Sequence, residues 1–144
     1  MRKRSLAREA ALKIFYQAEI TRRSIQLSAE LFWSEKEETD EVIKSFCDFL
    51  TQGVEQNFSA IDEKLAKHAT NWQLKRMAVI DRNILRMGVF ELLFAPDIPP
   101  KVTINEAIEL AKRYGDVDSS KFVNGVLDQV ARQCRVHEAN ARKK

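Results

Sequence analysis

The feature that most constrains the fold is the stretch from Val79 to Ala95, which is apolar on nearly every side when its residues are placed on a helix. Large apolar side chains surround the helix circumference at Ile80, Ile84, Leu85, Met87, Val89, Phe90, Leu92, Leu93 and Phe94. Such a helix is expected at the centre of a domain, covered by neighbouring helices. The PDIPP segment that follows contains every proline of the chain and separates this helix from the next one.

Residues that interrupt helices are rare in the rest of the chain. With 4 glycines and 3 prolines in 144 residues, long helices with short connections are favoured over strands. A hydrophobic content of 44% and a charged content of 31% are typical of a globular protein, and the length suits one domain. We predict an all-α fold of about seven helices, with residues 1–144 in one domain and a short basic tail from about residue 135.

Polar residues in front of apolar stretches indicate where the helices begin. We expect such N-caps at Ser5, at Thr39 or Asp40, at Ser59, and at Asp118 or Ser119. Thr103 and Glu106 have the T-x-x-E spacing of a capping box, which predicts a helix that ends near Gly115. A shorter helix is expected around residues 28–33, before the charged link SEKEETDE.

The spacing of apolar residues indicates which side of each helix faces inward. The inward positions of the first helix are Ala7, Ala11, Ile14, Phe15 and Ala18. The helix after the charged link has Val42, Ile43, Phe46, Phe49, Leu50 and Val54 at helical spacing, the next contains Ile61, Leu65 and Ala69, the helix after the prolines has Ile104, Ala107, Ile108 and Ala111, and the last has Val123, Val126, Leu127 and Val130. Leu12 and Tyr16 lie outside the first stripe, and either a neighbouring helix covers them or they form a partner site.

Charge is distributed unevenly along the chain, although the net charge is only +3. Residues 1–23 contain seven basic and two acidic side chains, and residues 132–144 contain five basic and one acidic. Residues 30–41, by contrast, contain six acidic side chains and one lysine. If the two ends converge in space, they would form a positive face of the kind that attracts nucleic acid.

No pattern in the sequence indicates catalysis, a metal site or a cofactor. His68 and His137 lack cysteine or carboxylate neighbours at ligand spacing, and Cys47 and Cys134 have no CxxC partner. The GxGxxG, P-loop, HExxH and GxSxG motifs are missing. No apolar run approaches the roughly 20 residues of a membrane span. We therefore expect a cytoplasmic protein that is not an enzyme.

Arg4 and Arg8 form the first candidate nucleic-acid site. They lie one turn apart near the N-terminus of the first helix, where the helix dipole favours anions. Two like charges at this spacing repel each other, and a phosphate between them would relieve that cost. The alternative is a solvated basic helix start, which the two arginines alone do not exclude.

The turn in RYGDVDSSKF forms the second candidate site. Lys112 and Lys121 can reach phosphates, while Tyr114 and Phe122 can stack on unpaired bases. The Asp118 carboxylate can accept hydrogen bonds from a base edge. Alternatively, Asp118 is only an N-cap and Phe122 only a core aromatic residue.

Asn124 and Gly125 interrupt the last helical stripe with a pair of residues that usually marks a turn. Glycine within a helix costs roughly 1 kcal/mol relative to alanine, so it requires a packing reason. We expect a close helix contact at Gly125, with Asn124 bonded to a neighbouring backbone.

Three segments together resemble the NusB family of transcription antitermination factors. INEAIELAKRYGDVDSSKFVNGVLD resembles the C-terminal signature of the family, IDRNILRMGVFEL its central helix, and RSLAREAALKIFYQ its arginine-bearing first helix. Residues 24–70 match only weakly. The resemblance implies two helical sub-bundles packed around one core.

The resemblance also implies a function. It predicts binding of boxA RNA from ribosomal RNA leaders, together with a small-subunit ribosomal protein, and delivery of this complex to RNA polymerase. The implied RNA-binding residues are Arg4, Arg8, Tyr114, Asp118, Lys121 and Phe122, and the implied protein-partner residues are Tyr16, Asp81, Arg82 and Leu85. The family more often has Glu at the position of Asp81 and Phe at the position of Tyr114.

Two alternatives stay open at this stage. Certain RNA cytosine methyltransferases carry a domain that resembles this family in front of a catalytic domain. A homodimer that hides the RNA-binding surface is the other alternative.

Overall fold

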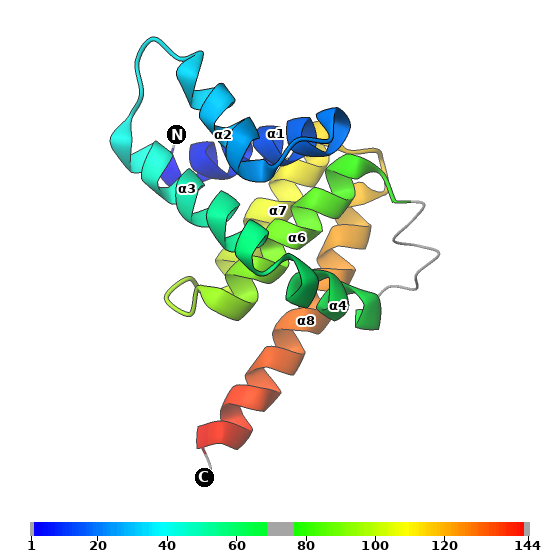
Figure 1. Ribbon diagram of the computed structural model, residues 1–144. Helices are drawn as coiled ribbons and strands as arrows, with labels where there is room; N and C mark the ends of the chain where they lie inside the picture. The colour runs from blue at the N-terminus through cyan, green and yellow to red at the C-terminus, as the bar shows by residue number, and fades with distance from the viewer. Residues whose placement is uncertain (1, 69–76, 143–144) are drawn as a thin grey trace. The chain divides into compact units, whose positions relative to one another are not determined.

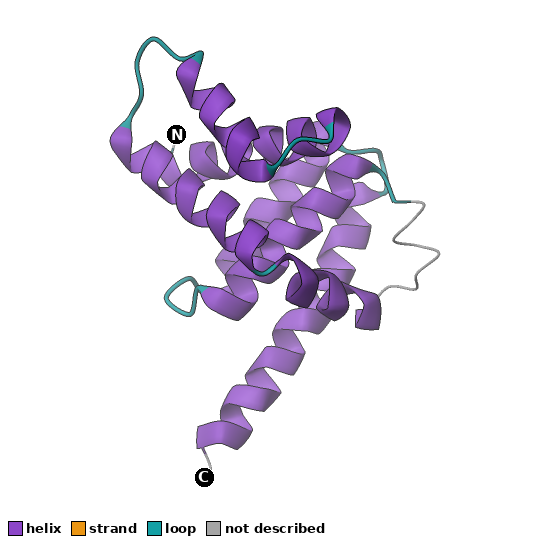
Figure 2. Cartoon of the chain, viewed as in Figure 1, coloured by secondary structure: helices purple, strands orange, loops and turns teal. Residues whose placement is uncertain are grey.

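The computed structural model describes residues 2–68 and 77–142, and it describes side chains up to Cys134. These residues form seven α-helices and no strand, which confirms the all-α prediction (Figures 1 and 2). The chain divides into two compact units, Met1–Phe58 and Ser59–Lys144.

The first unit contains α1 (Lys3–Thr21), α2 (Ile25–Ser34) and α3 (Glu41–Gln56), and each of these helices packs against the other two. The predicted inward stripe of α1 is confirmed, because all of its members are buried: Ala7, Ala11, Ile14, Phe15 and Ala18. Leu12 is also buried, whereas Tyr16 is 38% exposed. Of the two residues outside the stripe, Leu12 therefore belongs to the core and Tyr16 to the surface.

The α3 stripe was predicted less well. Leu50 and Val54 are buried as expected, but Val42 and Phe49 are exposed. Cys47 and Thr51 lie on the buried side as well. Spacing alone did not show which edge of this apolar surface α1 and α2 would cover.

The capping geometry confirms one predicted helix start in this unit and corrects another. The Asp40 carboxylate accepts hydrogen bonds from the backbone N–H groups of Val42 and Ile43, at 2.9 and 3.2 Å, and is the predicted N-cap of α3. The Ser5 prediction was wrong, because the Arg2 carbonyl already accepts from Leu6 N–H and α1 begins at Lys3.

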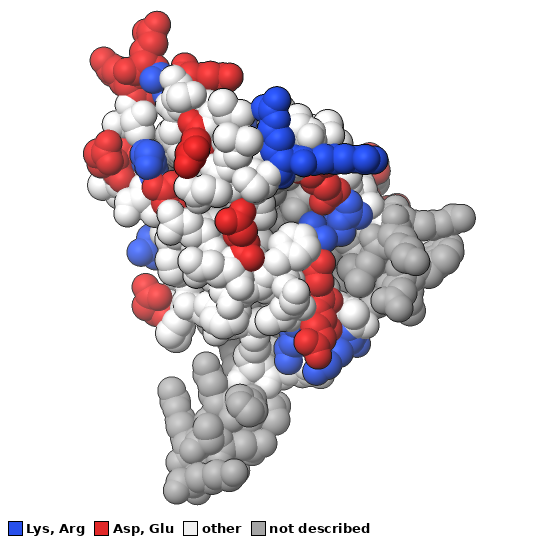
Figure 3. Space-filling view, viewed as in Figure 1, with Lys and Arg blue, Asp and Glu red and all other residues white. Residues whose placement is uncertain are grey.

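The start of α2 has a cap that the sequence analysis did not identify. The Ser24 hydroxyl accepts a hydrogen bond from Leu27 N–H at 3.0 Å, so α2 begins at Ile25, earlier than predicted. The link between α2 and α3 is the acidic segment, and acidic side chains gather over it in Figure 3.

The second unit contains α4 (Phe58–His68), α6 (Val79–Phe94), α7 (Pro100–Tyr114) and α8 (Ser119–Arg142). Helices α6, α7 and α8 pack pairwise against one another. The central position of α6 is confirmed, since every residue from Asn83 to Glu91 is buried. The predicted inward residues of α8 are buried too: Val123, Val126, Leu127 and Val130.

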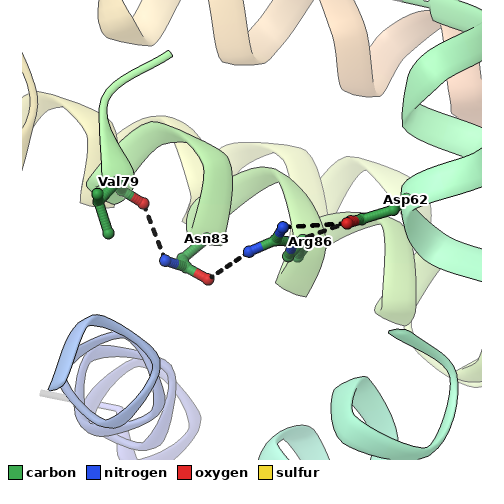
Figure 4. A network of polar contacts seen from close by, with 4 residues as sticks. All are labelled: Asp62, Val79, Asn83 and Arg86. Atoms are coloured by element: carbon green, nitrogen blue, oxygen red, sulfur yellow. Dashed lines mark hydrogen bonds and ion pairs between the residues drawn. The ribbon is translucent and has the colours of Figure 1, made fainter. Parts of the chain in front are cut away.

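Helix α4 is joined to α6 by the polar network in Figure 4. The Arg86 guanidinium donates to both carboxylate oxygens of Asp62, at 2.8 and 3.0 Å, and to the Asn83 side-chain oxygen at 3.3 Å. The Asn83 amide in turn donates to the Val79 carbonyl at 2.9 Å. Arg86 is thereby a structural residue, bonded through three nitrogens to Asp62 and Asn83.

Two further helix starts differ from the predictions. Ser59 is the second residue of α4 and not its cap, because α4 follows α3 after the single residue Asn57. Helix α7 begins at Pro100, whose fixed φ suits a first helical position. Thr103 therefore lies within the helix, and its hydroxyl donates to the buried Glu91 carboxylate at 3.0 Å in place of forming a capping box. Ala69 lies outside the described residues.

The inward side of α7 differs in part from its prediction. Ala107 and Ala111 are buried as expected, together with Thr103 and Leu110. Ile104 and Ile108 are only half-buried.

The close helix contact predicted at Gly125 is found at Gly88 instead. A Cβ atom on Gly88 would lie 2.8 Å from Leu127 Cδ1, so the absence of a side chain there lets α6 approach α8. Around Gly125, no described atom lies within 4 Å of such a Cβ, and Asn124 is exposed. The packing reason proposed for Gly125 was wrong.

Helix α8 continues through most of the predicted basic tail, to Arg142, and extends away from α6 and α7 in Figure 1. Within the described part of the chain, no helix is long and apolar enough to cross a membrane.

Candidate nucleic-acid interface

In the first unit, Arg4 and Arg8 lie against the same aromatic ring. The guanidinium carbon of Arg4 is 4.6 Å from the centroid of Phe46, and that of Arg8 is 5.1 Å from it. Phe46 belongs to α3 and stacks on Phe49, with 5.8 Å between the ring centroids. A ring face attracts cations, and here it holds two arginines that would otherwise repel each other.

The two arginines differ in exposure. Arg4 is exposed, whereas only 2% of Arg8 is accessible. Arg4 can therefore reach a phosphate directly, while Arg8 adds positive charge from below the surface. The structure brings the two predicted residues together but makes them unequal.

An ion pair fixes the start of α1 next to this cluster. Lys3 Nζ lies 3.0 Å from the Asp40 carboxylate, which also caps α3. The hydrogen bond from Lys3, together with that from Ile43 N–H, holds the pKa of Asp40 below its usual value. The basic end of α1 is thus tied to α3 at two points.

In the second unit, the α7–α8 turn comprises residues 115–118, between α7 and α8. Tyr114, Asp118 and Lys121 are exposed at and beside this turn, and Phe122 is half-buried. Val117, which the sequence analysis did not single out, is 97% exposed at its tip. The turn therefore presents an aromatic ring, a carboxylate, an amine and an apolar side chain to the solvent within one short segment.

Asp118 directly precedes α8, and its carbonyl accepts a hydrogen bond from Phe122 N–H at 3.1 Å. The Asp118 side chain is exposed, and none of the hydrogen bonds to the described residues involves its carboxylate. It holds the N-cap position without a side-chain cap bond, so the carboxylate is accessible to a ligand.

Ser119, the other residue expected as a cap, is the first residue of α8, and its hydroxyl makes no cap bond but hydrogen bonds outside the helix. Its hydroxyl accepts from Asp116 N–H at 2.8 Å and donates to Asp81 Oδ2 at 3.0 Å. Gly115 is extended, with φ −96° and ψ −174°, and so a left-handed conformation is not what requires glycine there. A Cβ on Gly115 would lie 2.5 Å from the Ser119 hydroxyl oxygen, and glycine is needed for this close approach.

The predicted protein-partner residues differ widely in accessibility. Leu85 is fully buried, so a partner cannot reach it in this conformation. Asp81 is half-buried and bound to Ser119, and Arg82 is half-buried with one N–H group donated to the Met77 carbonyl at 3.2 Å. In the other unit, Tyr16 is 38% exposed.

Burial raises the pKa of Asp81, and the nearby Asp116 charge acts in the same direction, while the Ser119 hydrogen bond opposes both.

Among the residues with described side chains, no three His, Cys, Asp or Glu residues are grouped so that they could hold a metal ion.

A model of the NusB family matches residues 5–132. The chain belongs to the NusB family. It is 46% identical to the transcription antitermination protein NusB of Myxococcus xanthus over 131 residues, which cover 89% of this chain and 94% of that protein. A NusB protein of Desulfitobacterium hafniense is also 46% identical, over 128 residues that cover 88% of this chain and 86% of that protein.

Solved NusB structures share the fold. The structure of T. maritima NusB has 39% sequence identity and a TM-score of 0.84, with 92% of each chain covered. Antitermination factors NusB and NusE have been solved in complex with double-stranded RNA, and a chain of that structure is 27% identical, with a TM-score of 0.83. The match covers 92% of this chain and 98% of that one. The three segments that suggested the NusB family lie within or at the edge of the matched residues.

Two residues that support the predicted sites were not found from the sequence. Phe46 was assigned only to an inward stripe, and Ser119 only to a cap. Each contacts a residue of a different helix, and helical spacing carries no signal for such a contact.

Proposed function

We propose that this chain is a non-catalytic RNA-binding factor of transcription antitermination. It binds boxA RNA of ribosomal RNA leaders together with a small-subunit ribosomal protein and delivers the complex to RNA polymerase in the cytoplasm. Membership of the NusB family and the names of its relatives support this proposal. The related complex of NusB and NusE with RNA supports an RNA ligand and a protein partner.

The observation that carries the RNA-binding proposal is the exposure of Tyr114, Asp118 and Lys121 around one turn. Tyrosine stacks on bases, lysine attracts phosphates, and a carboxylate without a structural partner can accept from base donors. Phe122 is half-buried, so it is only partly accessible. In the first unit, Arg4 and Arg8 provide a separate basic cluster for the RNA backbone.

For the ribosomal partner we propose Tyr16 as the main contact, with Arg82 as a further candidate. Tyr16 is exposed enough to pack against another protein and retains a hydroxyl for a hydrogen bond. Leu85 is fully buried in the second unit and is not among the proposed contacts.

A titration of boxA RNA and of a scrambled RNA, each with and without the ribosomal protein, tests the proposal. We expect boxA to bind more tightly than the scrambled RNA, and more tightly still when the partner is present. Equal boxA affinities with and without the partner would contradict the adaptor mechanism. Light scattering on the same samples identifies a closed dimer, which would exclude RNA in proportion to its population.

Two lysines of the second unit provide a matched pair of variants for the same titration. Lys121→Ala removes a charge beside the α7–α8 turn, whereas Lys67→Ala removes a charge, also exposed, from α4. We expect Lys121→Ala to lower the salt dependence of binding by about one unit of slope. If both variants behave alike, the turn is not the RNA-binding surface.

A further inference from the structure

One hydroxyl group connects the α7–α8 turn to the first turn of α6. Ser119 Oγ donates to Asp81 Oδ2 at 3.0 Å and accepts from the backbone N–H of Asp116 at 2.8 Å. Asp81 lies in the first turn of α6, and Asp116 lies within the α7–α8 turn. The three groups form a chain in which each donor faces one acceptor.

These three hydrogen-bonded groups lie at a closely packed point of the second unit. Ser119 is buried, with 4% of its surface accessible, and Gly115 leaves no space for a Cβ above it. A buried hydroxyl without an acceptor is an unsatisfied polar group, which destabilises this conformation of the turn and favours a rearranged one. The conformation of the turn thus depends on an acceptor that α6 provides.

The second carboxylate oxygen of Asp81 is also buried, and it has no hydrogen-bond partner among the described residues. The Asp81 carboxylate is therefore poorly solvated at this oxygen, while its other oxygen accepts the hydrogen bond from Ser119. A carboxylate in this arrangement faces inward to the turn and not outward to a protein partner.

We propose that Asp81 is a positioning residue of the α7–α8 turn, acting through Ser119 to hold the conformation in which Tyr114 and Asp118 are presented to RNA. This inference rests on the proposed RNA-binding function of the turn. It differs from the direct partner contact that the family resemblance implied for Asp81.

The chain contains a matched control for this link. Thr103 is a second buried hydroxyl that donates to a carboxylate of α6, Glu91, also at 3.0 Å. It lies in α7, before the turn. Removing either hydroxyl takes one hydrogen-bond donor from a carboxylate of α6, but only the Ser119 hydroxyl contacts the turn.

RNA affinity is measured for Ser119→Ala, Asp81→Ala, Asp81→Asn and Thr103→Val, at a temperature where circular dichroism shows all four to be folded. We expect Ser119→Ala and Asp81→Ala to weaken boxA binding about tenfold, as the loss of one well-placed contact would. Asp81→Asn keeps an acceptor oxygen for Ser119 and should recover most of the affinity that Asp81→Ala loses. Thr103→Val should bind RNA as the parent chain does.

A result in which Ser119→Ala binds normally, or in which Thr103→Val is weakened as much, overturns the proposal. Hydrogen exchange at the Asp116 amide tests the link without RNA. We expect this amide to be protected in the parent chain and in Thr103→Val, and to exchange faster in Ser119→Ala and Asp81→Ala. Unchanged exchange would overturn the positioning role, whereas faster exchange in a chain that binds no RNA would overturn only the proposed function.

Discussion

The guanidinium carbon of Arg4 lies 4.6 Å from the centroid of the Phe46 ring, and Arg8 approaches the same ring. The ring orients two cations that repel each other, so it should matter for RNA binding without contacting RNA itself. We expect Phe46→Leu to weaken RNA affinity severalfold, equivalent to about 1 kcal/mol, while retaining the α3 core.

The matched control for this substitution is Phe32→Leu, since Lys36 Nζ lies 4.8 Å from the centroid of the Phe32 ring. It removes the same kind of contact from the first unit, but from a pair outside the proposed site. RNA titration of both variants checks the expectation. Equal losses of affinity in the two would show that Phe46 acts only through the stability of the unit.

Asp118 should affect which RNA is bound more than how stable the chain is. Its carboxylate forms no hydrogen bond with any described residue, so Asp118→Ala should change the melting temperature little. If the carboxylate accepts from a base edge, its loss should reduce discrimination between boxA and scrambled RNA by roughly 1–3 kcal/mol. The control is Asp97→Ala, an exposed aspartate in the loop before α7. A lower melting temperature with unchanged discrimination would restore the capping role.

Arg86 should contribute strongly to stability. It is nearly buried and is bonded to both oxygens of Asp62, and so Arg86→Ala would leave Asp62 and Asn83 without that donor. We expect a loss on the order of 2 kcal/mol in the free energy of unfolding, below the value for a fully buried pair because Asp62 is partly exposed. Arg86→Lys should recover only part of it, since lysine lacks the planar fork.

The half-buried pair of Lys44 and Asp48 is the control for Arg86. These side chains lie 2.8 Å apart on α3, at the i,i+4 spacing. Lys44→Ala should cost no more than about 0.5 kcal/mol, because a single i,i+4 pair on a helix surface contributes little. Chemical denaturation measures both variants, and similar losses would contradict the structural role assigned to Arg86.

The helices themselves were predictable because helical periodicity is a local property. Val79–Ala95 was predicted as the central helix, and α6 spans Val79–Phe94. The starts of helices were predicted less well, since a backbone carbonyl at Arg2 or a proline at Pro100 can begin a helix before the polar residue that resembles a cap.

Contacts between particular residues of different helices could not be predicted from the sequence. The links between Arg4 and Phe46, Asp62 and Arg86, and Asp81 and Ser119 each join two different helices. A single sequence shows which face of a helix is apolar but not which partner packs on it. The same reason explains why the close approach was assigned to Gly125, although it occurs at Gly88.

Tyr16 provides the test of the protein-partner surface. It is partly exposed on α1, and its loss should leave the buried stripe of that helix intact. We expect Tyr16→Ala to weaken binding of the ribosomal protein by about 1–2 kcal/mol, as for a partly exposed aromatic contact, and to leave RNA affinity without the partner unchanged. Isothermal titration with each ligand separates the two effects. Val42→Ala, at an exposed apolar site on α3, serves as the control.

The two cysteines should differ in reactivity. Burial raises the pKa of the Cys47 thiol to about 12, so almost no thiolate forms at neutral pH, and reagents cannot reach the sulfur in the folded unit. Cys134 is only half-buried. In the variant Cys134→Ser, modification of Cys47 by a thiol reagent at pH 8 should require opening of the first unit, and its rate should rise with denaturant along with local unfolding. Fast modification of Cys47 without denaturant would contradict its buried position on α3.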